Sequence, residues 1–543
     1  MAELKSRGLS TDIQEADVVD LAHDGRGIAR IGGKAVFIEG ALPGERVRLR
    51  VFKRRRQFDE AGLVDVLIPS PDRVTPRCAH FGICGGCSLQ HLAPAAQLAA
   101  KQRQLLENLE RIGRVRPERV FAPLRGPEWG YRRRARLGIK YVHKKGRVLA
   151  GFREREKPYI ADVRRCEVLL ERFASLPEHL AALVETLSLR DKIPQVELAA
   201  GDSGEGPEGA ADPGRGSGAA YDRGEGPEGA AGPEGGPPEA AGGPGRGLGL
   251  EARCDPRQGS GAAYDRGEDS ERVGGPGGGP GAVSGPGGGS GTRRCSSSPD
   301  SGSSAALVFR IMEAPTESDL GKLAAFGERH AVQIYLQSGG IETVRPLREG
   351  YAPLRFAVDD SRVTLEFGPA DFIQVNGGIN RSMVAAAIDL LQPTATDTVL
   401  DLFCGLANFT LSLGARARRV VGVDGDAALA AKARANAGRN GCLNAEFFVD
   451  NLFEPARLGS WARDTYDLVL LDPPRVGAAE ILERMPQWRP RRLVYISCHP
   501  GSLARDAGIL VEGQGYRLVG AGVMDMFPHT THVESIAVFE KNA

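Results

Sequence analysis

The last third of the chain alternates short apolar runs with helical or turn segments, and this alternation constrains the fold more than any other feature. Short apolar runs of this kind are typical of buried parallel strands, and the segments between them suit crossover connections. We therefore predict a doubly wound, Rossmann-like α/β domain over residues 355–543, with ligands bound beyond the carboxyl ends of its strands. The predicted strands cover residues 399–403, 420–424, 445–449, 468–472 and 493–498.

Residues 8–70 show a second pattern, in which strand-like stretches at 16–21, 34–38, 46–51 and 60–68 are separated by glycine-rich turns. Short strands at regular spacing predict a small antiparallel β-barrel of the oligonucleotide-binding (OB) type. The sequence between the two, residues 71–354, is predicted to form a central α+β domain. A multidomain chain is in keeping with a length of 543 residues.

A dense basic run lies within the predicted barrel. The formal charge of the whole chain is only +1, so a nucleic-acid surface has to come from a local cluster of this kind. Phe52 and Phe58 are interleaved with the cations, and this mixture suits phosphate contacts combined with base stacking. We favour RNA binding over a solvated edge strand, and regard residues 131–136 as a second, weaker basic patch. The cations of the run are Arg46, Arg48, Arg50, Lys53, Arg54, Arg55 and Arg56.

Residues 201–304 are rich in Gly, Pro, Ser, Glu and Arg and have almost no large apolar side chains. Such a stretch buries too little apolar surface to offset the entropy of ordering its backbone. The decapeptide at 216–225 recurs unchanged at 259–268, which indicates local duplication. We predict a disordered insertion in the loop of one hairpin, between strands at 195–199 and 305–310. An RNA tether formed by its arginines is the competing interpretation.

No apolar run reaches the roughly 18–20 residues that a membrane-spanning helix needs, and the first residues lack the apolar core of a secretory signal. We therefore expect a cytoplasmic protein with no membrane partner. In that reducing environment the nine cysteines are not expected to form disulfides. Metal ligation and nucleophilic catalysis are their candidate roles.

Cys78, Cys84 and Cys87 form a tight cluster in the sequence, and Cys166 lies far downstream. A structural zinc site usually draws on two close pairs of ligands, whereas three clustered thiolates and a remote fourth suit a cubane [4Fe–4S] cluster. A zinc site and free thiols are the alternatives. Because the chemistry inferred below needs no electron, we expect the cluster to organise the fold or an RNA-binding surface.

The predicted C-terminal strands carry features of a nucleotide site. The first ends in a turn with Gly405 but lacks the other glycines of a dinucleotide fingerprint, so a pyrophosphate cradle is not expected. The second ends at Asp424, which is placed to accept hydrogen bonds from ribose hydroxyls. A ribose and adenine without a pyrophosphate indicate S-adenosylmethionine, with Asn451 near the adenine and Asp472 closing the fourth strand. A generic pair of doubly wound strands is the alternative.

Cys498 stands at the end of the last of these strands, where its thiol would face the cofactor crevice. Carbon 5 of a pyrimidine is a poor nucleophile, and a thiolate that adds to carbon 6 makes an enolate that activates it. A base must then remove the proton from carbon 5, and Glu534, in the sequence His532-Val533-Glu534, suits this step. A buried structural cysteine is the alternative for Cys498.

Five motifs of this chain resemble those of the RNA uracil-carbon-5 methyltransferase family, especially its branch acting on 23S ribosomal RNA. The resemblance covers nearly the whole chain outside 201–304 and likens the N-terminal barrel to a TRAM domain. It implies conversion of a uridine to 5-methyluridine with S-adenosylmethionine, and it supports a [4Fe–4S] cluster at the four cysteines above. In family order, the motifs lie at residues 372–376, 401–409, 471–475, 497–500 and 532–534.

The same resemblance implies roles for single residues, with Cys498 as the nucleophile and Glu534 as the base. Two positions depart from the family pattern. Asp424 stands where the family usually has a glutamate, which shortens the reach to the ribose, and His499 stands where it usually has an asparagine. The residues implied to bind S-adenosylmethionine or to position the base are Gln374, Phe403, Asn408, Asp424, Asn451 and Asp472.

Two other functions remain open from the sequence. A cytosine-carbon-5 methyltransferase would use the same thiolate chemistry, but the motifs around Cys498 and Glu534 resemble the uracil family. A non-catalytic RNA-binding protein of ribosome assembly would have little use for Cys498, Glu534 and the cofactor strands together. The predicted partner is RNA, with 23S ribosomal RNA favoured. We expect a monomer with no obligate protein partner.

Overall fold

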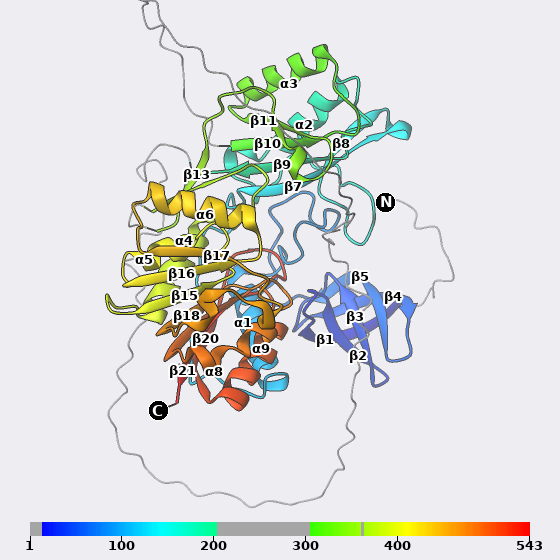
Figure 1. Cartoon of the computed structure of the whole chain (residues 1–543). Coiled ribbons are helices and arrows are strands. Elements are labelled where there is room, and N and C mark those ends of the chain that lie inside the picture. Colours follow the sequence, from blue (N-terminus) through cyan, green and yellow to red (C-terminus); the bar gives the residue numbers. More distant parts are fainter. Residues whose placement is uncertain (1–12, 203–304, 360–362, 543) are drawn as a thin grey trace, which may run out of the picture. The chain divides into compact units, whose positions relative to one another are not determined.

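The structure, a computed structural model, describes residues 13–202, 305–359 and 363–542. These residues form a closed barrel, a six-stranded sheet, an eight-stranded sheet and a two-stranded hairpin (Figure 1). The predicted insertion lies outside the described residues from position 203 to 304. Among the described helices, none is long and apolar enough to cross a membrane.

The predicted N-terminal barrel is confirmed, and its closure depends on alternation along the strands. On β4, Val47, Leu49 and Val51 are buried while the residues between them are exposed. The barrel has one strand more than the sequence suggested, β2, and one of its pairings, between β3 and β5, is parallel. The strands are β1 (Ile13–Leu21), β2 (Gly27–Ile31), β3 (Lys34–Glu39), β4 (Arg46–Arg54) and β5 (Phe58–Ile68), closed in the order β1-β2-β3-β5-β4.

The six-stranded central sheet contains the hairpin predicted on either side of the insertion. Strand β9 pairs antiparallel with β10, and Ala200 lies opposite Ala305. Helices α2 (Leu176–Glu185) and α3 (Glu317–Arg329) pack on this sheet through a shared apolar core. The strands, in sheet order, are β12 (Arg345–Pro346), β11 (Gln333–Gln337), β10 (Ala305–Arg310), β9 (Gln195–Ala200), β7 (Arg134–Val142) and β8 (Arg147–Gly151).

The eight-stranded sheet is the doubly wound sheet predicted from the alternating pattern. Its strands β15 to β19 are parallel, and β21 runs antiparallel between β19 and β20. In sheet order the strands are β17 (Ala445–Val449), β16 (Arg419–Asp424), β15 (Thr398–Leu402), β18 (Leu468–Leu471), β19 (Arg492–Ser497), β21 (Glu534–Lys541), β20 (Tyr516–Met524) and β6 (Arg119–Val120).

Helices cover both faces of this sheet because successive buried residues of each strand point to opposite sides. On β15, Val399 joins one apolar core and Leu400 joins the other. The first core includes residues of α4 (Gly377–Leu391), α5 (Thr410–Gly414) and α6 (Ala427–Arg439). The second includes residues of α1 (Pro94–Arg111), α7 (Ala479–Leu482), α8 (Met485–Trp488) and α9 (Pro500–Gly508).

Residues 94–120 belong by sequence to the predicted central domain, but the structure packs them against the C-terminal sheet. Leu98, Leu105 and Leu109 of α1 lie in the same core as Leu503 of α9. Strand β6 pairs in parallel with β20. Helix α1, which follows the barrel in the sequence, therefore belongs structurally to the C-terminal domain.

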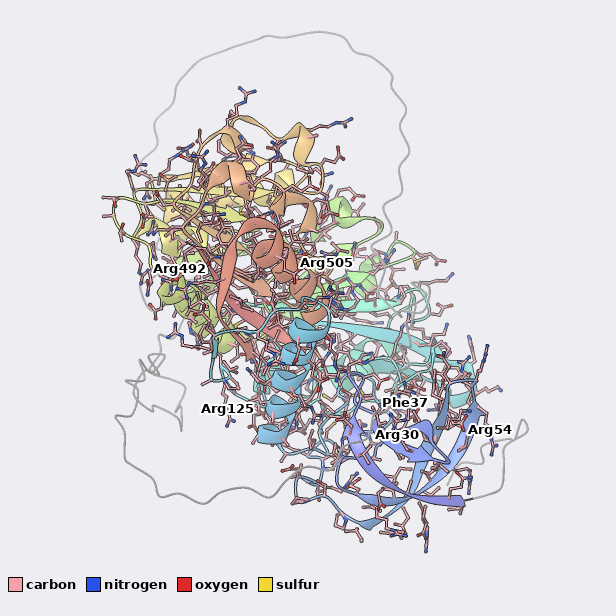
Figure 2. All side chains as sticks on the ribbon, turned by 90° about the horizontal axis from the view of Figure 1, so that it is seen from below. Arg30, Phe37, Arg54, Arg125, Arg492 and Arg505 are labelled. Atoms are coloured by element: carbon pink, nitrogen blue, oxygen red, sulfur yellow. The ribbon has the colours of Figure 1, made fainter. Side chains whose placement is uncertain are left out.

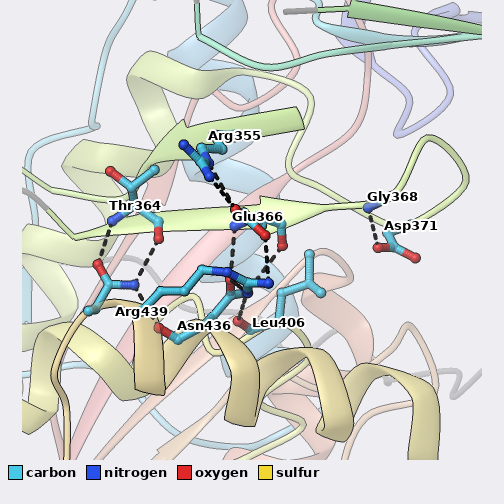
Figure 3. Close-up of polar contacts among 9 residues, drawn as sticks. Arg355, Thr364, Glu366, Gly368, Asp371, Leu406, Asn436 and Arg439 are labelled. Carbon is cyan, nitrogen blue, oxygen red and sulfur yellow. Dashed lines mark hydrogen bonds and ion pairs between the residues drawn. The ribbon is translucent and has the colours of Figure 1, made fainter. Parts of the chain in front are cut away.

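The hairpin of β13 (Leu354–Ala357) and β14 (Thr364–Phe367) leads into the predicted cofactor motif at 372–376, and buried polar contacts fix it (Figure 3). The amide of the fully buried Asn436 accepts a hydrogen bond from Glu366 N and donates to the carbonyl oxygens of Glu366 and Leu406. The Glu366 carboxylate also pairs with Arg439 at 2.7 Å. These contacts tie the hairpin to α6 and to the turn after β15.

Candidate active site

Strand register brings the predicted nucleophile and the predicted base together. Strands β19 and β21 are antiparallel, and Ser497 lies opposite Ser535. The Ser535 hydroxyl donates a hydrogen bond to the Ser497 carbonyl oxygen at 3.0 Å. Cys498 follows β19 and Glu534 begins β21, so the register brings the two residues close together, and the charge of Glu534 acts on the Cys498 thiol. Cys498 is half-buried and Glu534 is 3% exposed.

Asp472, Arg475 and His532 lie around this pair, and burial lowers the pKa of His532 to about 4, so its ring is neutral near pH 7. Asp472 directly follows β18, whose last residue pairs with Tyr495 of β19. Arg475 Nη2 lies 3.0 Å from His532 Nδ1. The sequence pointed to Asp472 but gave no role to Arg475 or His532, although both stand inside the quoted motifs. In the structure, Arg475 is a cation close to Cys498 and Glu534.

The acidic groups of the site have pKa values that suit proton transfer. Burial raises the pKa of Glu534 to about 8, and the charge of Asp472 adds to this. Burial also raises the pKa of Asp472 to about 7. Burial, with Glu534 and Asp472 nearby, raises the pKa of the Cys498 thiol to about 11, while Arg475 acts in the opposite direction. Carboxyls with pKa values near neutrality can hold and release protons at working pH.

The turn after β15 carries residues of the predicted nucleotide site. Asp424, at the end of β16, accepts hydrogen bonds from the backbone N–H groups of Gly405 (3.0 Å) and Asp426 (2.8 Å). Phe403 and Gly405 both have positive φ, and no heavy atom lies within 4 Å of a Cβ built at Gly405. Open space beside a held carboxylate at the carboxyl edge suits a ribose and an adenine. The departure at position 424 leaves a carboxylate in place.

Three further polar side chains, those of Asn408, Asn380 and Asp401, lie on or next to the turn after β15. The Asn408 and Asn380 amides exchange two hydrogen bonds of 3.0 Å, which joins the turn after β15 to α4. Asp401 is fully buried, and its Oδ2 accepts a hydrogen bond from Thr410 at 2.5 Å. Its Oδ1 has no hydrogen-bond partner among the described residues. The sequence assigned a role in the site only to Asn408. Asp401 stands inside the motif 401–409 without a role, and Asn380 lies outside the motifs, so their contacts are known only from the structure.

The structure places Gln374 and Asn451 at the same edge of the sheet but shows other contacts for them. Gln374 precedes the Asn376 cap of α4, and its carbonyl oxygen accepts a hydrogen bond from Arg133 Nε at 2.8 Å. Asn451 is exposed after β17, where its side chain donates to Glu454 and accepts from the N–H of Phe453. Their roles in cofactor binding stay predictions.

His499, the second departure, caps the helix that follows the nucleophile. Its Nδ1 accepts a hydrogen bond from Ser502 N at 3.1 Å, at the N-terminus of α9. An asparagine side chain caps helices in the same way, through an oxygen that accepts from the same backbone position. Burial, together with Arg475 and Arg505, lowers the pKa of His499, which keeps the accepting nitrogen unprotonated.

This cap predicts a pH-dependent difference between His499 variants. His499→Asn should match the original protein at pH 7.5, whereas His499→Ala should lose about 1 kcal/mol, the usual value of a helix cap. Because the pKa of His499 is lowered in the folded state, protons favour the unfolded chain as pH falls below about 6.5. The original protein should therefore lose more stability between pH 7.5 and 5.5 than His499→Asn. Urea unfolding at both pH values measures this, and parallel losses would contradict it.

The four predicted cluster ligands line a single small cavity. Residues 78–89, called here the cysteine loop, contain three of these ligands. Gly85 lets this loop lie close to the backbone of Arg153, since a Cβ at Gly85 would lie 3.0 Å from the Arg153 carbonyl oxygen. Among the described residues, no three His, Cys, Asp or Glu side chains are grouped to hold a single metal ion. Burial raises the pKa of Cys84 to about 11 and of Cys87 to about 12. The predicted ligands that line this cavity are Cys78, Cys84, Cys87 and Cys166.

The basic run lies on the outer face of the barrel, where Arg30 and Arg54 are labelled in Figure 2. Phe52 is 41% exposed on the same strand as Arg50 and Arg54. Those two arginines and Arg56 have no ion-pair partner within the described part of the chain. The remaining cations are partly neutralised, since Glu15 pairs with Arg46 and Arg48, and Glu60 pairs with Lys53 and Arg55.

The second basic patch, at 131–136, is only partly a surface, since Arg136 is exposed and pairs with Glu197. Tyr131 is 4% exposed and Arg133 is 3% exposed. Arg134 pairs with Glu197 at 3.3 Å. The Arg133 guanidinium instead packs over the Phe356 ring at 4.4 Å. Tyr131 and Arg133 are internal because this segment leads into β7, which lies between β9 and β8 in the central sheet.

Comparison with known proteins gives two family matches. Residues 310–542 match the family described as tRNA (Uracil-5-)-methyltransferase, and residues 11–64 match the TRAM domain. The second match coincides with the closed barrel, and the first contains the doubly wound sheet.

Relatives that match over the whole chain are also named as uracil-carbon-5 methyltransferases, in their case of 23S rRNA. The chain is 42% identical to the 23S rRNA (uracil(1939)-C(5))-methyltransferase RlmD of Stenotrophomonas maltophilia strain K279a, with 100% of both chains covered. It is 41% identical, over the same shares, to the protein of that name from Xanthomonas axonopodis pv. citri. Among solved structures, Pyrococcus abyssi tRNA (uracil-54, C5)-methyltransferase in complex with S-adenosyl-L-homocysteine matches with a TM-score of 0.60 and 20% identity. That match covers 97% of this chain and 99% of the other, and it shows a shared fold.

Proposed function

The chain belongs to the S-adenosylmethionine-dependent RNA uracil-carbon-5 methyltransferase family, and we propose that it methylates carbon 5 of a uridine in 23S ribosomal RNA. The observation that carries the proposal is the juxtaposition of Cys498 and Glu534 across β19 and β21. The relatives named for 23S rRNA match over their whole length, which supports the ribosomal substrate. An enzyme for ribosomal RNA would work in the cytoplasm, where we place it.

The proposed reaction uses Cys498 and Glu534 in sequence. The Cys498 sulfur forms a bond to carbon 6 of the uracil, and the electron pair of the 5,6 double bond moves toward carbon 5 and the carbonyl at carbon 4. Bound S-adenosylmethionine would supply the methyl group of its sulfonium to carbon 5, and the S–CH3 bond would break to leave S-adenosyl-L-homocysteine. Glu534 then removes the proton from carbon 5, the double bond re-forms, and the bond from sulfur to carbon 6 breaks. The Cys498 thiolate is regenerated.

Burial and charge support this division of roles. A carboxyl with a pKa of about 8 is a stronger base, once ionised, than an exposed glutamate. The Cys498 thiol, with a pKa of about 11, is protonated before RNA binds, and it gives up this proton to water as its sulfur bonds to carbon 6. Arg475, beside His532, favours the thiolate electrostatically and stabilises negative charge as it develops.

The cofactor would lie along the turn after β15. Asp424 is suited to the ribose hydroxyls, because backbone N–H groups hold its carboxylate at the end of β16, beside the open space at Gly405. The rings of Phe403 and Phe453, with centroids 5.9 Å apart, offer apolar surface for an adenine. The proposed set of residues around the cofactor and the uracil is completed by Gln374, Asn408, Asn451 and Asp472.

RNA would be bound in part by the outer face of the barrel. Arg50, Arg54 and Arg56 are free to contact phosphates, and Phe52 is placed to stack on a base. We propose that the barrel and the doubly wound domain engage the same RNA. A monomer suffices for this function, since both the base and the nucleophile come from one chain.

We also propose a [4Fe–4S] cluster held by Cys78, Cys84, Cys87 and Cys166. One cavity lined by four thiols supports it, and a metal would replace the protons that the raised pKa values keep on Cys84 and Cys87. Protein purified without oxygen should be brown and contain about four iron and four sulfide per chain. Cys87→Ala should lose both, whereas Cys442→Ala, which changes a half-buried cysteine elsewhere, should keep them. About one zinc per chain and no visible absorbance would contradict the cluster.

One experiment tests the proposed function against its alternatives. The protein is incubated with unmodified 23S ribosomal RNA and S-adenosylmethionine labelled in the methyl group, and the nucleosides are then separated. Label in 5-methyluridine is the expected result. Label in 5-methylcytidine would make the protein a cytosine methyltransferase, and RNA binding without label would make it a non-catalytic assembly protein. Unmodified transfer RNA, assayed in parallel, tests the choice of substrate.

A further inference from the structure

The loop that leads to the proposed base, residues 525–533, is held from outside the C-terminal sheet. Strand β20 ends at Met524 and β21 begins at Glu534, so this loop sets where Glu534 enters the sheet. The residues that hold it come from the cysteine loop, from α1 and from the segment just before β7. Their hydrogen bonds go to Asp525, Phe527, Pro528 and His529 of the loop itself.

His529 is the central contact of this loop. It is 3% exposed and has a positive φ of 64°, a conformation that a residue with a side chain adopts only when its surroundings impose it. Its carbonyl oxygen accepts hydrogen bonds from the N–H groups of Ser88 and Leu89, both at 2.9 Å. Its ring stacks on Trp129 with centroids 3.8 Å apart.

Ser88 directly follows Cys87, one of the four cysteines that line the cavity. The backbone of the cysteine loop therefore donates straight into the loop that precedes Glu534. Gln97 of α1 reinforces this junction, because its Oε1 accepts from His529 N at 2.9 Å. The Nε2 of the same side chain donates to the Leu89 carbonyl oxygen at 3.0 Å, so a single amide connects both loops.

Two further side chains fix the beginning of the 525–533 loop. Lys101 of α1, 3% exposed, donates to Asp525 Oδ1 at 2.8 Å and to the Phe527 carbonyl oxygen at 3.0 Å. The Tyr131 hydroxyl donates to the Pro528 carbonyl oxygen at 3.1 Å. Within the loop, the Thr530 hydroxyl donates back to Phe527 O at 2.9 Å. A short loop with so many buried anchors has little freedom to move.

We propose that the cysteine loop, α1 and Tyr131 act through His529 as a brace that positions Glu534 for removal of the proton from carbon 5. The inference rests on the proposed function, and it makes His529 and its partners positioning residues. The cysteine cavity then affects the reaction through backbone hydrogen bonds, without any electron transfer. Loosening the brace should slow the step after methyl transfer and leave substrate binding unchanged.

Tyr131→Phe is the sharpest test, because it removes one hydrogen bond to the brace and keeps the ring. The chain offers a matched control, Tyr516→Phe, since the buried Tyr516 hydroxyl donates to the Pro490 carbonyl oxygen at 2.9 Å, away from the loop. Loss of one buried hydrogen bond corresponds to about a tenfold change in rate when it acts on the slow step. Tyr131→Phe should lower kcat about tenfold, leave KM for RNA and S-adenosylmethionine within about twofold, and accumulate a methylated covalent complex with RNA.

Tyr516→Phe should show normal kcat and no accumulated complex, even if its thermal stability falls as much as that of Tyr131→Phe. Equal kcat and equal complex in the two variants would overturn the proposal. A second measurement needs neither RNA nor cofactor: in Gln97→Met, amide hydrogen exchange should accelerate both in residues 86–92 and in residues 525–533. Acceleration in only one of these segments would also overturn it. If the unaltered protein methylates no RNA, the proposed function fails, and the exchange experiment still decides whether the two loops are coupled.

Discussion

Cys498→Ala should abolish methyl transfer to RNA while S-adenosylmethionine still binds. The thiol forms the bond to carbon 6 that makes carbon 5 nucleophilic, so its removal takes away the first chemical step and not a contribution to binding. Removing a covalent nucleophile usually lowers turnover by well over about 10³-fold. Single-turnover transfer of a labelled methyl group measures the loss, and calorimetric titration with S-adenosyl-L-homocysteine should give a dissociation constant within about twofold of the original.

Two controls make the result specific. Cys498→Ser keeps a polar group of similar size and should be as inactive as the alanine variant, because an alcohol at this position has no base strong enough to ionise it. Cys442→Ala changes a half-buried cysteine outside the site and should retain activity. Turnover by Cys498→Ala at even a tenth of the original rate would rule out the covalent mechanism.

The sequence predicted the parts of the fold that follow from periodicity. Apolar runs marked the five parallel strands, and the alternation along residues 46–51 marked a barrel strand. The sequence placed Cys498 and Glu534 at the ends of strands. It did not show that these two strands are neighbours or what their register is, so only the structure brought the two residues together. Strand β6 was not predicted, because two exposed residues that pair at a sheet edge carry no pattern.

The remaining differences come from long-range packing. Arg133 and Tyr131 look like an exposed basic and aromatic patch, but the sheet around them makes them internal. Arg475 and His532 gained a role only when their 3.0 Å contact appeared beside the nucleophile. The function of Lys101 depends on Asp525, which is more than 400 residues away in the sequence. Pairings of this kind leave no local signal in a single sequence.

Glu534→Gln should stop the reaction after methyl transfer and accumulate a covalent complex between the protein and methylated RNA. The amide keeps the shape of the side chain but cannot take the proton from carbon 5, and the bond from sulfur to carbon 6 breaks only after that proton has left. Release of product should fall at least about a hundredfold, the lower end of what a general base contributes. Denaturing gel electrophoresis with RNA labelled at one end and S-adenosylmethionine labelled in the methyl group should show both labels in the complex.

The pH dependence distinguishes a base from a residue that merely shapes the site. Burial raises the pKa of Glu534 to about 8, so the fraction ionised, and with it the rate of product release, should rise between pH 6.5 and 8.5 in the original enzyme. Glu534→Gln should lose that rise. A carboxyl whose pKa is raised on folding stabilises the protein at low pH and loses that contribution as pH increases toward 8. The glutamine variant should therefore be no less stable than the original at pH 8.5, which excludes unfolding as the cause. Normal turnover by Glu534→Gln, with no covalent complex at any pH, would assign the base to another residue, and Asp472, with a pKa of about 7, would be the next to replace.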